Sequence, residues 1–211
     1  SWIFFTLSLI EDETKFELAL DLISHRGPDA QNIFISQDHK LMLGHTRLSI
    51  IDLNEASNQP FFSSDGRYVI IFNGEIYNYL ELRDEMIAAG ISFKTKSDTE
   101  VILNAYIMYG EEFVKKLNGI FAFAIFDKFN GKIVLYRDLF GVKPVYYYYS
   151  DGLFVFCSEV RPIKQIINKL PIRPKAISEL FLYSYLPGEK TFIEGIEELS
   201  PGGLITISEG S

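Results

Sequence analysis

Four polar side chains occur where the sequence otherwise predicts apolar strands or the start of a helix. Arg47 falls inside an apolar strand pattern, where a charge is costly without a partner. Asn73, Gly74 and Glu75 close another apolar run, and Asp98 stands at a helix start. A guanidinium can bind a carboxylate through two parallel hydrogen bonds, two carboxylates can hold an ammonium, and an amide beside a glycine N–H can stabilise an oxyanion. The combination suits an α-amino acid whose carbonyl carbon is attacked.

Each of these residues also has a simpler structural interpretation. Arg47 could pair with a carboxylate, Asn73-Gly74 could form an ordinary turn, and Asp98 could favour the helix N-terminus. Taken singly, the structural interpretation is the better one for each. Taken together, they favour a binding site, provided that the fold brings them to one place.

The elements that must position these residues are mostly short strands. IFAFAIFD, residues 120–127, is apolar on both faces and is typical of an interior strand. Tight turns such as Asn130-Gly131 and Asp151-Gly152 indicate hairpins and therefore antiparallel pairing. The other predicted strands are 2–7, 32–35, 41–51, 67–72, 132–136, 144–149 and 153–157.

Helical periodicity appears over residues 13–24, 79–89 and 98–117, the last bent at Gly110. Ser97 and Glu100 have the capping-box spacing at the start of the third helix. Doubly buried antiparallel strands with few helices are covered when two sheets pack face to face and the helices lie outside. We therefore expect an α/β fold, a four-layer αββα sandwich. In the tail, residues 170–211, we expect a short helix at 176–185 and a final hairpin.

Composition narrows the class of protein. With 211 residues and 47% hydrophobic composition the chain can form one substantial core, and we expect a single domain. A formal charge of −8 and a pI near 5.0 make nucleic acid and membrane poor partners. The longest apolar runs are far short of the ~20 residues that span a bilayer, and the N-terminus lacks the basic flank of a signal peptide. These features favour a cytoplasmic protein.

Several common chemistries have no motif in this sequence. It contains no phosphate loop, no dinucleotide glycine fingerprint and no metal-type His/Cys spacing, so we expect no metal. The scattered histidines His25, His39 and His45 are interpreted as hydrogen-bonded structural residues. The single cysteine, Cys157, excludes an internal disulfide and lies in an apolar strand pattern, which predicts a buried thiol with a raised pKa.

Seven segments, in order over nearly the whole chain, resemble the motifs of one family. They are similar to the glutaminase domain of glutamine-hydrolysing asparagine synthetases, a class II glutamine amidotransferase of the N-terminal-nucleophile type. The tail segment PGEKTFIEGIEELSPGG resembles the stretch that closes this domain before the synthetase domain. The seven segments are HRGPDA, LGHTRLSIIDL, NQPF, FNGEIYNYLELR, SDTEVIL, LNGIFAFAIFD and RDLFGVKPVYY.

The resemblance implies a role for each polar residue. Arg47 would bind the α-carboxylate of glutamine, while Asp98 and Glu75 would hold its α-ammonium. The side chain of Asn73 and the backbone N–H of Gly74 would stabilise the tetrahedral oxyanion. The resemblance also implies an Ntn-hydrolase-like sandwich and the release of ammonia for amide transfer to aspartate or a similar acceptor.

The first two residues depart from the family pattern. The family begins Cys-Gly and uses the N-terminal thiol as nucleophile, activated by its own α-amino group, whereas this sequence begins Ser1-Trp2. The spacing from Ser1 to Arg47 places Ser1 at the nucleophile position. A hydroxyl is harder to deprotonate than a thiol, and Trp2 adds bulk where the family has glycine, so both residues count against fast hydrolysis.

Three hypotheses follow from this departure. The first is a working glutaminase domain, the second a degenerate non-hydrolysing scaffold, and the third a glutamine-binding module without turnover. We expect no cofactor in residues 1–211, and ATP and Mg²⁺ for a C-terminal synthetase domain of a longer chain. L-glutamine and that domain are the expected partners, and a homodimer is left open.

Overall fold

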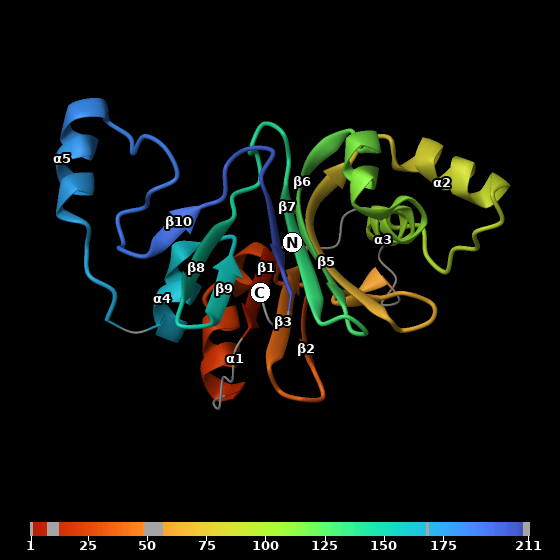
Figure 1. Cartoon of the computed structure of the whole chain (residues 1–211), viewed down its shortest axis with the longest axis horizontal. Helices are drawn as coiled ribbons and strands as arrows, with labels where there is room; N and C mark the ends of the chain where they lie inside the picture. The colour runs from red at the N-terminus through yellow and green to blue at the C-terminus, as the bar shows by residue number, and fades with distance from the viewer. Residues whose placement is uncertain (1, 8–12, 49–56, 168, 209–211) are drawn as a thin grey trace.

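The computed structural model describes residues 2–7, 13–48, 57–167 and 169–208, and it shows two antiparallel sheets facing one another between helices (Figure 1). This is the predicted αββα sandwich. Among the described residues, no helix has the length and apolar character needed to cross a membrane.

The first sheet has six strands in the order β10-β8-β9-β1-β3-β2, and all of its pairings are antiparallel. One of these pairings, β8–β9, is the hairpin predicted from the Asp151-Gly152 turn. The strands span β1 Trp2–Leu7, β2 Ala30–Ile35, β3 Leu41–Arg47, β8 Tyr146–Ser150, β9 Leu153–Cys157 and β10 Ile196–Glu198.

The second sheet has five strands in the order β11-β7-β6-β5-β4. Its central strand β6, predicted as interior, is buried along most of its length because apolar residues cover both faces. The edge strand β4 is only two residues long, so past Ile70 the edge of β5 opposite β6 has no strand beside it in the described chain. The strands span β4 Phe61–Phe62, β5 Tyr68–Ile76, β6 Gly119–Asp127, β7 Lys132–Arg137 and β11 Leu204–Ile207.

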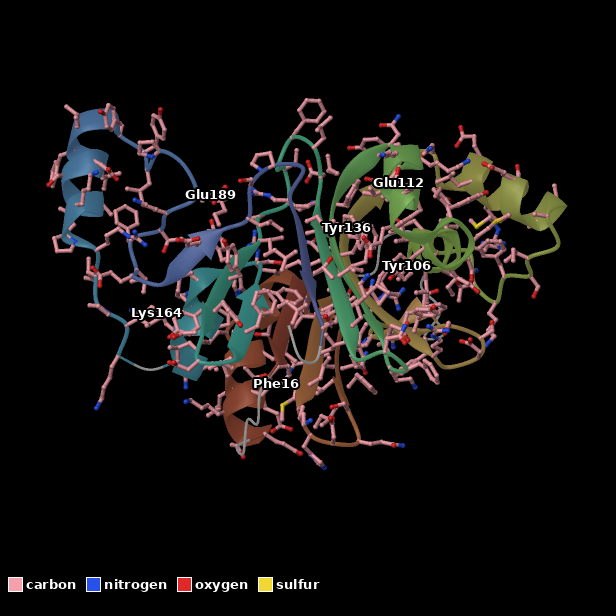
Figure 2. The ribbon with its side chains drawn as sticks, in the orientation of Figure 1. Phe16, Tyr106, Glu112, Tyr136, Lys164 and Glu189 are labelled. Carbon is pink, nitrogen blue, oxygen red and sulfur yellow. The ribbon has the colours of Figure 1, made fainter. Side chains whose placement is uncertain are left out.

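Helices cover the outer face of each sheet (Figure 1). Phe16 of α1 packs under the first sheet, whereas Tyr106 of α3 and Tyr136 of β7 lie on the helix side of the second (Figure 2). A third apolar cluster fills the space between the sheets. The helices span α1 Glu13–Asp21, α2 Tyr79–Ala88, α3 Asp98–Tyr109, α4 Val160–Ile167 and α5 Pro174–Tyr183, with short 3₁₀ segments η1 at Ser24–Arg26 and η3 at Gly110–Lys116.

The start and the bend of the third predicted helix are confirmed. Ser97 accepts a hydrogen bond from the Glu100 N–H, and the helix passes into η3 at Gly110, whose φ is 65°. The Glu100 carboxylate behaves differently from a capping box. It accepts from the backbone N–H groups of Lys94 and Thr95, and so fixes the loop before the helix.

The predicted final hairpin is wrong. β10 pairs with β8 in the first sheet, while β11 pairs with β7 in the second. Residues 196–207 therefore join the same margin of both sheets, and we call them the closing strap. The buried Arg137 guanidinium fixes the strap by donating to the Leu199 carbonyl and pairing with Glu198 at 2.7 Å. Helix α4 was not predicted from the sequence.

Candidate active site

Arg47 ends β3 on the face of the first sheet that looks toward the second. Successive strand side chains alternate between faces, and Leu41 and Leu43 lie in the cluster between the sheets, so His45 and Arg47 point the same way. The Arg47 side chain is buried, and its Nη1 donates to Oδ1 of Asn58 at 2.5 Å. A guanidinium held at the end of a strand between two sheets is well placed to receive a carboxylate.

Asn73 projects toward the first sheet from the facing strand. Val69 and Ile71 of β5 belong to the cluster between the sheets, so alternation puts Asn73 and Glu75 on that face as well. Asn73 is 4% exposed, and its Nδ2 has no hydrogen-bond partner among the described residues. Buried amide groups are usually paired. Asn73 therefore carries a donor that is free to bind a ligand.

The N–H of Gly74 points to the open edge of β5. The Phe72 N–H donates to Oε1 of Gln59 at 2.5 Å, and the Phe72 carbonyl accepts from Nε2 of His45 at 3.2 Å, so neither group is turned toward β6. Antiparallel pairs alternate in their hydrogen bonding, and Gly74 faces Phe121 two residues further along.

The partner of Gly74 confirms this orientation. Both peptide groups of Phe121 are taken by Asp138: the Phe121 N–H donates to Oδ2 at 3.3 Å, and its carbonyl accepts from the Asp138 N–H at 2.8 Å. The Gly74 N–H therefore points away from β6, at the margin where β4 does not extend.

Only glycine fits position 74. Its φ is 153°, which side chains rarely adopt, and a Cβ would lie 2.1 Å from the Ile120 carbonyl oxygen and 2.7 Å from Cα of Phe121. The backbone approach needed at this strand end explains why a glycine follows Asn73.

Asp98 approaches the same edge from α3. Its Oδ2 accepts the Ile76 N–H at 3.2 Å, and the side chain is 6% exposed. Burial, with a smaller contribution from the charge of Glu75, raises the pKa of Asp98 from 3.8 to about 6. The exposed Glu75 thus lies close enough for its charge to act on Asp98. Two neighbouring carboxylates, one of them poorly solvated, would be stabilised by a ligand ammonium.

The structure therefore brings Arg47, Asn73, Gly74, Glu75 and Asp98 to one end of the sandwich, at the ends of β3 and β5 and the start of α3. Their roles in binding and catalysis remain predictions. Ser1 lies outside the described residues. The first described residue, Trp2, pairs in β1 with Thr46, the neighbour of Arg47.

Sequence reasoning missed Asn58 and Gln59, whose side chains contact these elements. The sequence feature that could have pointed to them is the pair of consecutive amide side chains in NQPF, just before the short strand β4. The Gln59 side chain is buried and links β5 to α3, accepting from Phe72 and donating from Nε2 to Oγ1 of Thr99 at 3.2 Å.

Each histidine lies beside an acceptor group, which fits the structural interpretation made from the sequence. His25 lies 3.3 Å from Glu159, and His39 lies 3.2 Å from Glu13. His45 is fully buried, and burial lowers its pKa to about 3, so the ring is neutral and its Nε2 is the protonated nitrogen that donates to Phe72.

In the described part of the chain, the other potential metal ligands and the cysteine do not form a metal site or a second catalytic site. These residues contain no group of three or more His, Cys, Asp or Glu placed to hold a metal ion. Burial raises the pKa of Cys157 to about 12, which confirms the prediction of a buried thiol.

The same fold occurs in two solved structures. Glutamine phosphoribosylpyrophosphate amidotransferase from B. subtilis, solved with ADP and GMP, superposes on 99% of this chain and 47% of its own with a TM-score of 0.74 and 18% identity. A second structure, described as the allosteric regulatory enzyme of purine biosynthesis, gives a TM-score of 0.73 at 17% identity over 99% of this chain and 47% of its own.

The chain belongs to the family of glutamine amidotransferase domains, which matches residues 3–211. Asparagine synthetase [glutamine-hydrolyzing] 1 of Bacillus subtilis is 41% identical over 88% of this chain and 29% of its own length. Asparagine synthetase [glutamine-hydrolyzing] 3 of the same organism is 37% identical over 99% of this chain and 34% of its own. A putative asparagine synthetase [glutamine-hydrolyzing] 2 of Methanocaldococcus jannaschii is 40% identical over 78% of this chain and 35% of its own.

This chain is thus a glutamine amidotransferase domain, homologous to the N-terminal domains of asparagine synthetases, and it spans about a third of the length of these relatives. The similarities do not favour a degenerate scaffold over this assignment.

Proposed function

We propose that this domain hydrolyses L-glutamine to glutamate and ammonia at the end of the sandwich where β3, β5 and α3 meet. Arg47 would bind the α-carboxylate through its guanidinium, and Asp98 with Glu75 would pair with the α-ammonium. The side-chain amide would then lie beside Asn73 and Gly74. Recognition of both charged groups of a free amino acid accounts for a cation and two carboxylates at one site.

The chemical step begins at Ser1. Its Oγ attacks the side-chain carbonyl carbon of glutamine, and the α-amino group of the same residue accepts the hydroxyl proton. Asn73 Nδ2–H and the Gly74 N–H stabilise the resulting oxyanion. The C–N bond breaks as the leaving nitrogen takes the proton and departs as ammonia, leaving an acyl ester on Ser1. Water then attacks the ester and releases glutamate.

The observation that carries this proposal is the free donor of Asn73, which is buried and unpartnered among the described residues. An unmade hydrogen bond of a buried amide costs about 1–3 kcal/mol. That cost is recovered when a developing negative charge accepts the bond. The same donor beside the outward-pointing Gly74 N–H provides the paired donors that acyl transfer needs.

The ammonia would serve a second reaction in a longer protein. The relatives extend well beyond their matched portions, which make up about a third of their length, and carry the name asparagine synthetase. We propose a C-terminal synthetase domain that uses ATP and Mg²⁺ to activate aspartate or a similar carboxylate as the ammonia acceptor.

Glutamate release from glutamine by the purified protein tests the proposal. Asn73→Ala should lower kcat by about 10²–10³-fold with a smaller effect on KM, because the amide acts on the transition state. Asn130→Ala is a matched control at the β6–β7 turn, at the opposite end of β6, and should leave both constants unchanged. Equal rates for the wild type and Asn73→Ala would reject the assignment of Asn73.

A further inference from the structure

Asn58 and Gln59 precede β4 and contact three of the elements that carry the site. Asn58 accepts from the Arg47 guanidinium, and the Gln59 side chain binds both the Phe72 N–H and Thr99. The residues that they hold adjoin site residues or belong to the site, since Phe72 precedes Asn73 and Thr99 follows Asp98.

Gln59 replaces a missing strand. Because β4 pairs only with Val69 and Ile70, the outer edge of β5 has no described strand neighbour from residue 71 onward. A buried backbone N–H without a partner is costly, and Gln59 Oε1 satisfies that of Phe72 at 2.5 Å. The Gln59 side chain satisfies this one N–H group and leaves the following residues of the β5 edge uncovered. A longer β4 would instead have covered the Gly74 N–H.

The same side chain sets the spacing between the edge of β5 and α3. Gln59 Nε2 donates to Thr99 Oγ1 at 3.2 Å, and the Gln59 side chain is 5% exposed, so its rotamer is restricted by packing. Phe72 and Gly74 lie ~7 Å apart along the strand and point their N–H groups to the same edge. Holding Phe72 to Thr99 therefore also fixes the distance between the Gly74 N–H and the Asp98 carboxylate.

We propose that Gln59 is a positioning residue for the oxyanion site. Its side-chain amide couples β5 to α3, and so aligns the Gly74 N–H with the carboxylate that holds the substrate ammonium. This inference rests on the proposed glutamine hydrolysis. Asn58 has a different effect, because it touches the side chain that would bind the substrate carboxylate and not the strand that carries the oxyanion donors.

The two neighbouring residues should therefore change different kinetic constants. Gln59→Met keeps the length of the side chain and removes both hydrogen bonds; we expect kcat to fall about 10-fold or more, with KM changed less than about 3-fold, since sub-ångström misplacement of reacting groups has large effects. Asn58→Ala should raise KM with little change in kcat. Gln31→Met is a matched control, because Gln31 is exposed on β2 and its side chain hydrogen-bonds only to Asp21 among the described residues.

Amide hydrogen exchange gives a readout independent of turnover. In Gln59→Met, exchange should accelerate at Phe72 and also at Ile76, whose N–H is bound by Asp98 of α3. If exchange accelerates at Phe72 alone, Gln59 has only a local role and the proposal is overturned. An unchanged kcat would also overturn it. If Gln59→Met does not fold, Thr99→Val removes only the link to α3 and should still lower kcat; no decrease would again overturn it. If the wild type releases no glutamate, the proposed function is refuted. Hydrogen exchange at Ile76 would still test whether Gln59 couples β5 to α3.

Discussion

Replacing Asp98 by asparagine should make the protein more stable at neutral pH while weakening glutamine binding. In the native state the carboxyl is buried, and its pKa is raised from 3.8 to about 6. A carboxyl with a raised native pKa stabilises the folded state below its unfolded pKa, and this contribution is lost as the pH rises through the native pKa. The difference between these pKa values corresponds to about 3 kcal/mol.

This free-energy difference can be measured by comparing the stability of the wild type with that of Asp98→Asn as a function of pH. The asparagine side chain would be neutral at every pH and could still accept the Ile76 N–H, so Asp98→Asn avoids the cost of ionisation. Relative to the wild type, the free energy of unfolding of Asp98→Asn should rise by about 3 kcal/mol between about pH 3 and pH 7. Urea denaturation at half-unit pH intervals, without glutamine, measures this difference.

Asp127→Asn provides a control of opposite sign. The hydrogen bonds from Arg67 lower the pKa of Asp127, so its stabilising effect is present above its unfolded pKa and lost in acid. Asp127→Asn should therefore be less stable than the wild type at pH 7, with the gap closing in acid. A pH-independent difference for Asp98→Asn, or a variant less stable than the wild type at pH 7, would refute the reasoning. In the wild type, the KM for glutamine should rise below about pH 6, because protonated Asp98 no longer attracts the ammonium.

Three other substitutions test separate parts of the site. Gly74→Ala should destabilise the fold by about 1–3 kcal/mol, because the new Cβ would overlap the Ile120 carbonyl; an unchanged Tm would contradict the backbone geometry. Arg47→Lys should raise the KM for glutamine by about 10- to 100-fold through the loss of a two-point carboxylate contact, and steady-state glutamate release would expose the error if KM were unchanged. Ser1→Cys should increase kcat for glutamate release, because a thiol is more readily deprotonated than a hydroxyl; a rate no higher than that of the wild type would show that the hydroxyl is not what limits turnover.

The layers of the fold could be predicted because the information is local. Strands such as β6 are apolar on both faces, and short turns such as Asn130-Gly131 fix antiparallel neighbours. The closing strap was mispredicted for the opposite reason. Its two short strands look like a hairpin locally, yet their partners are β8 and β7, far away in the chain. Local pattern does not specify which exposed sheet edge such a short strand will join.

The sequence predicts which residue types form the candidate site, but not the hydrogen bonds that hold them in place. A charge in an apolar strand and an amide-glycine pair at a strand end are visible in the sequence, which is why Arg47 and Asn73 were selected. Gln59 can bind the Phe72 N–H only because β4 is short, and His45 can bind the Phe72 carbonyl only because the two sheets lie close together. Neither the length of β4 nor the distance between the sheets can be predicted from a local sequence pattern. The free donor of Asn73 likewise becomes apparent only when every neighbouring acceptor has been placed.

The closing strap has a consequence for how the molecule responds to its substrate. Arg47 belongs to one sheet and Asn73 to the other, whereas the strap joins the two sheets at their opposite margin, beside β8 and β7. A glutamine held between Arg47 and Asn73 would therefore add a second link between the sheets near the margin opposite the strap, besides the hydrogen bond from His45 to Phe72. Occupancy of the site should raise the cooperativity with which the two sheets unfold, so that heating or denaturant separates them in one transition.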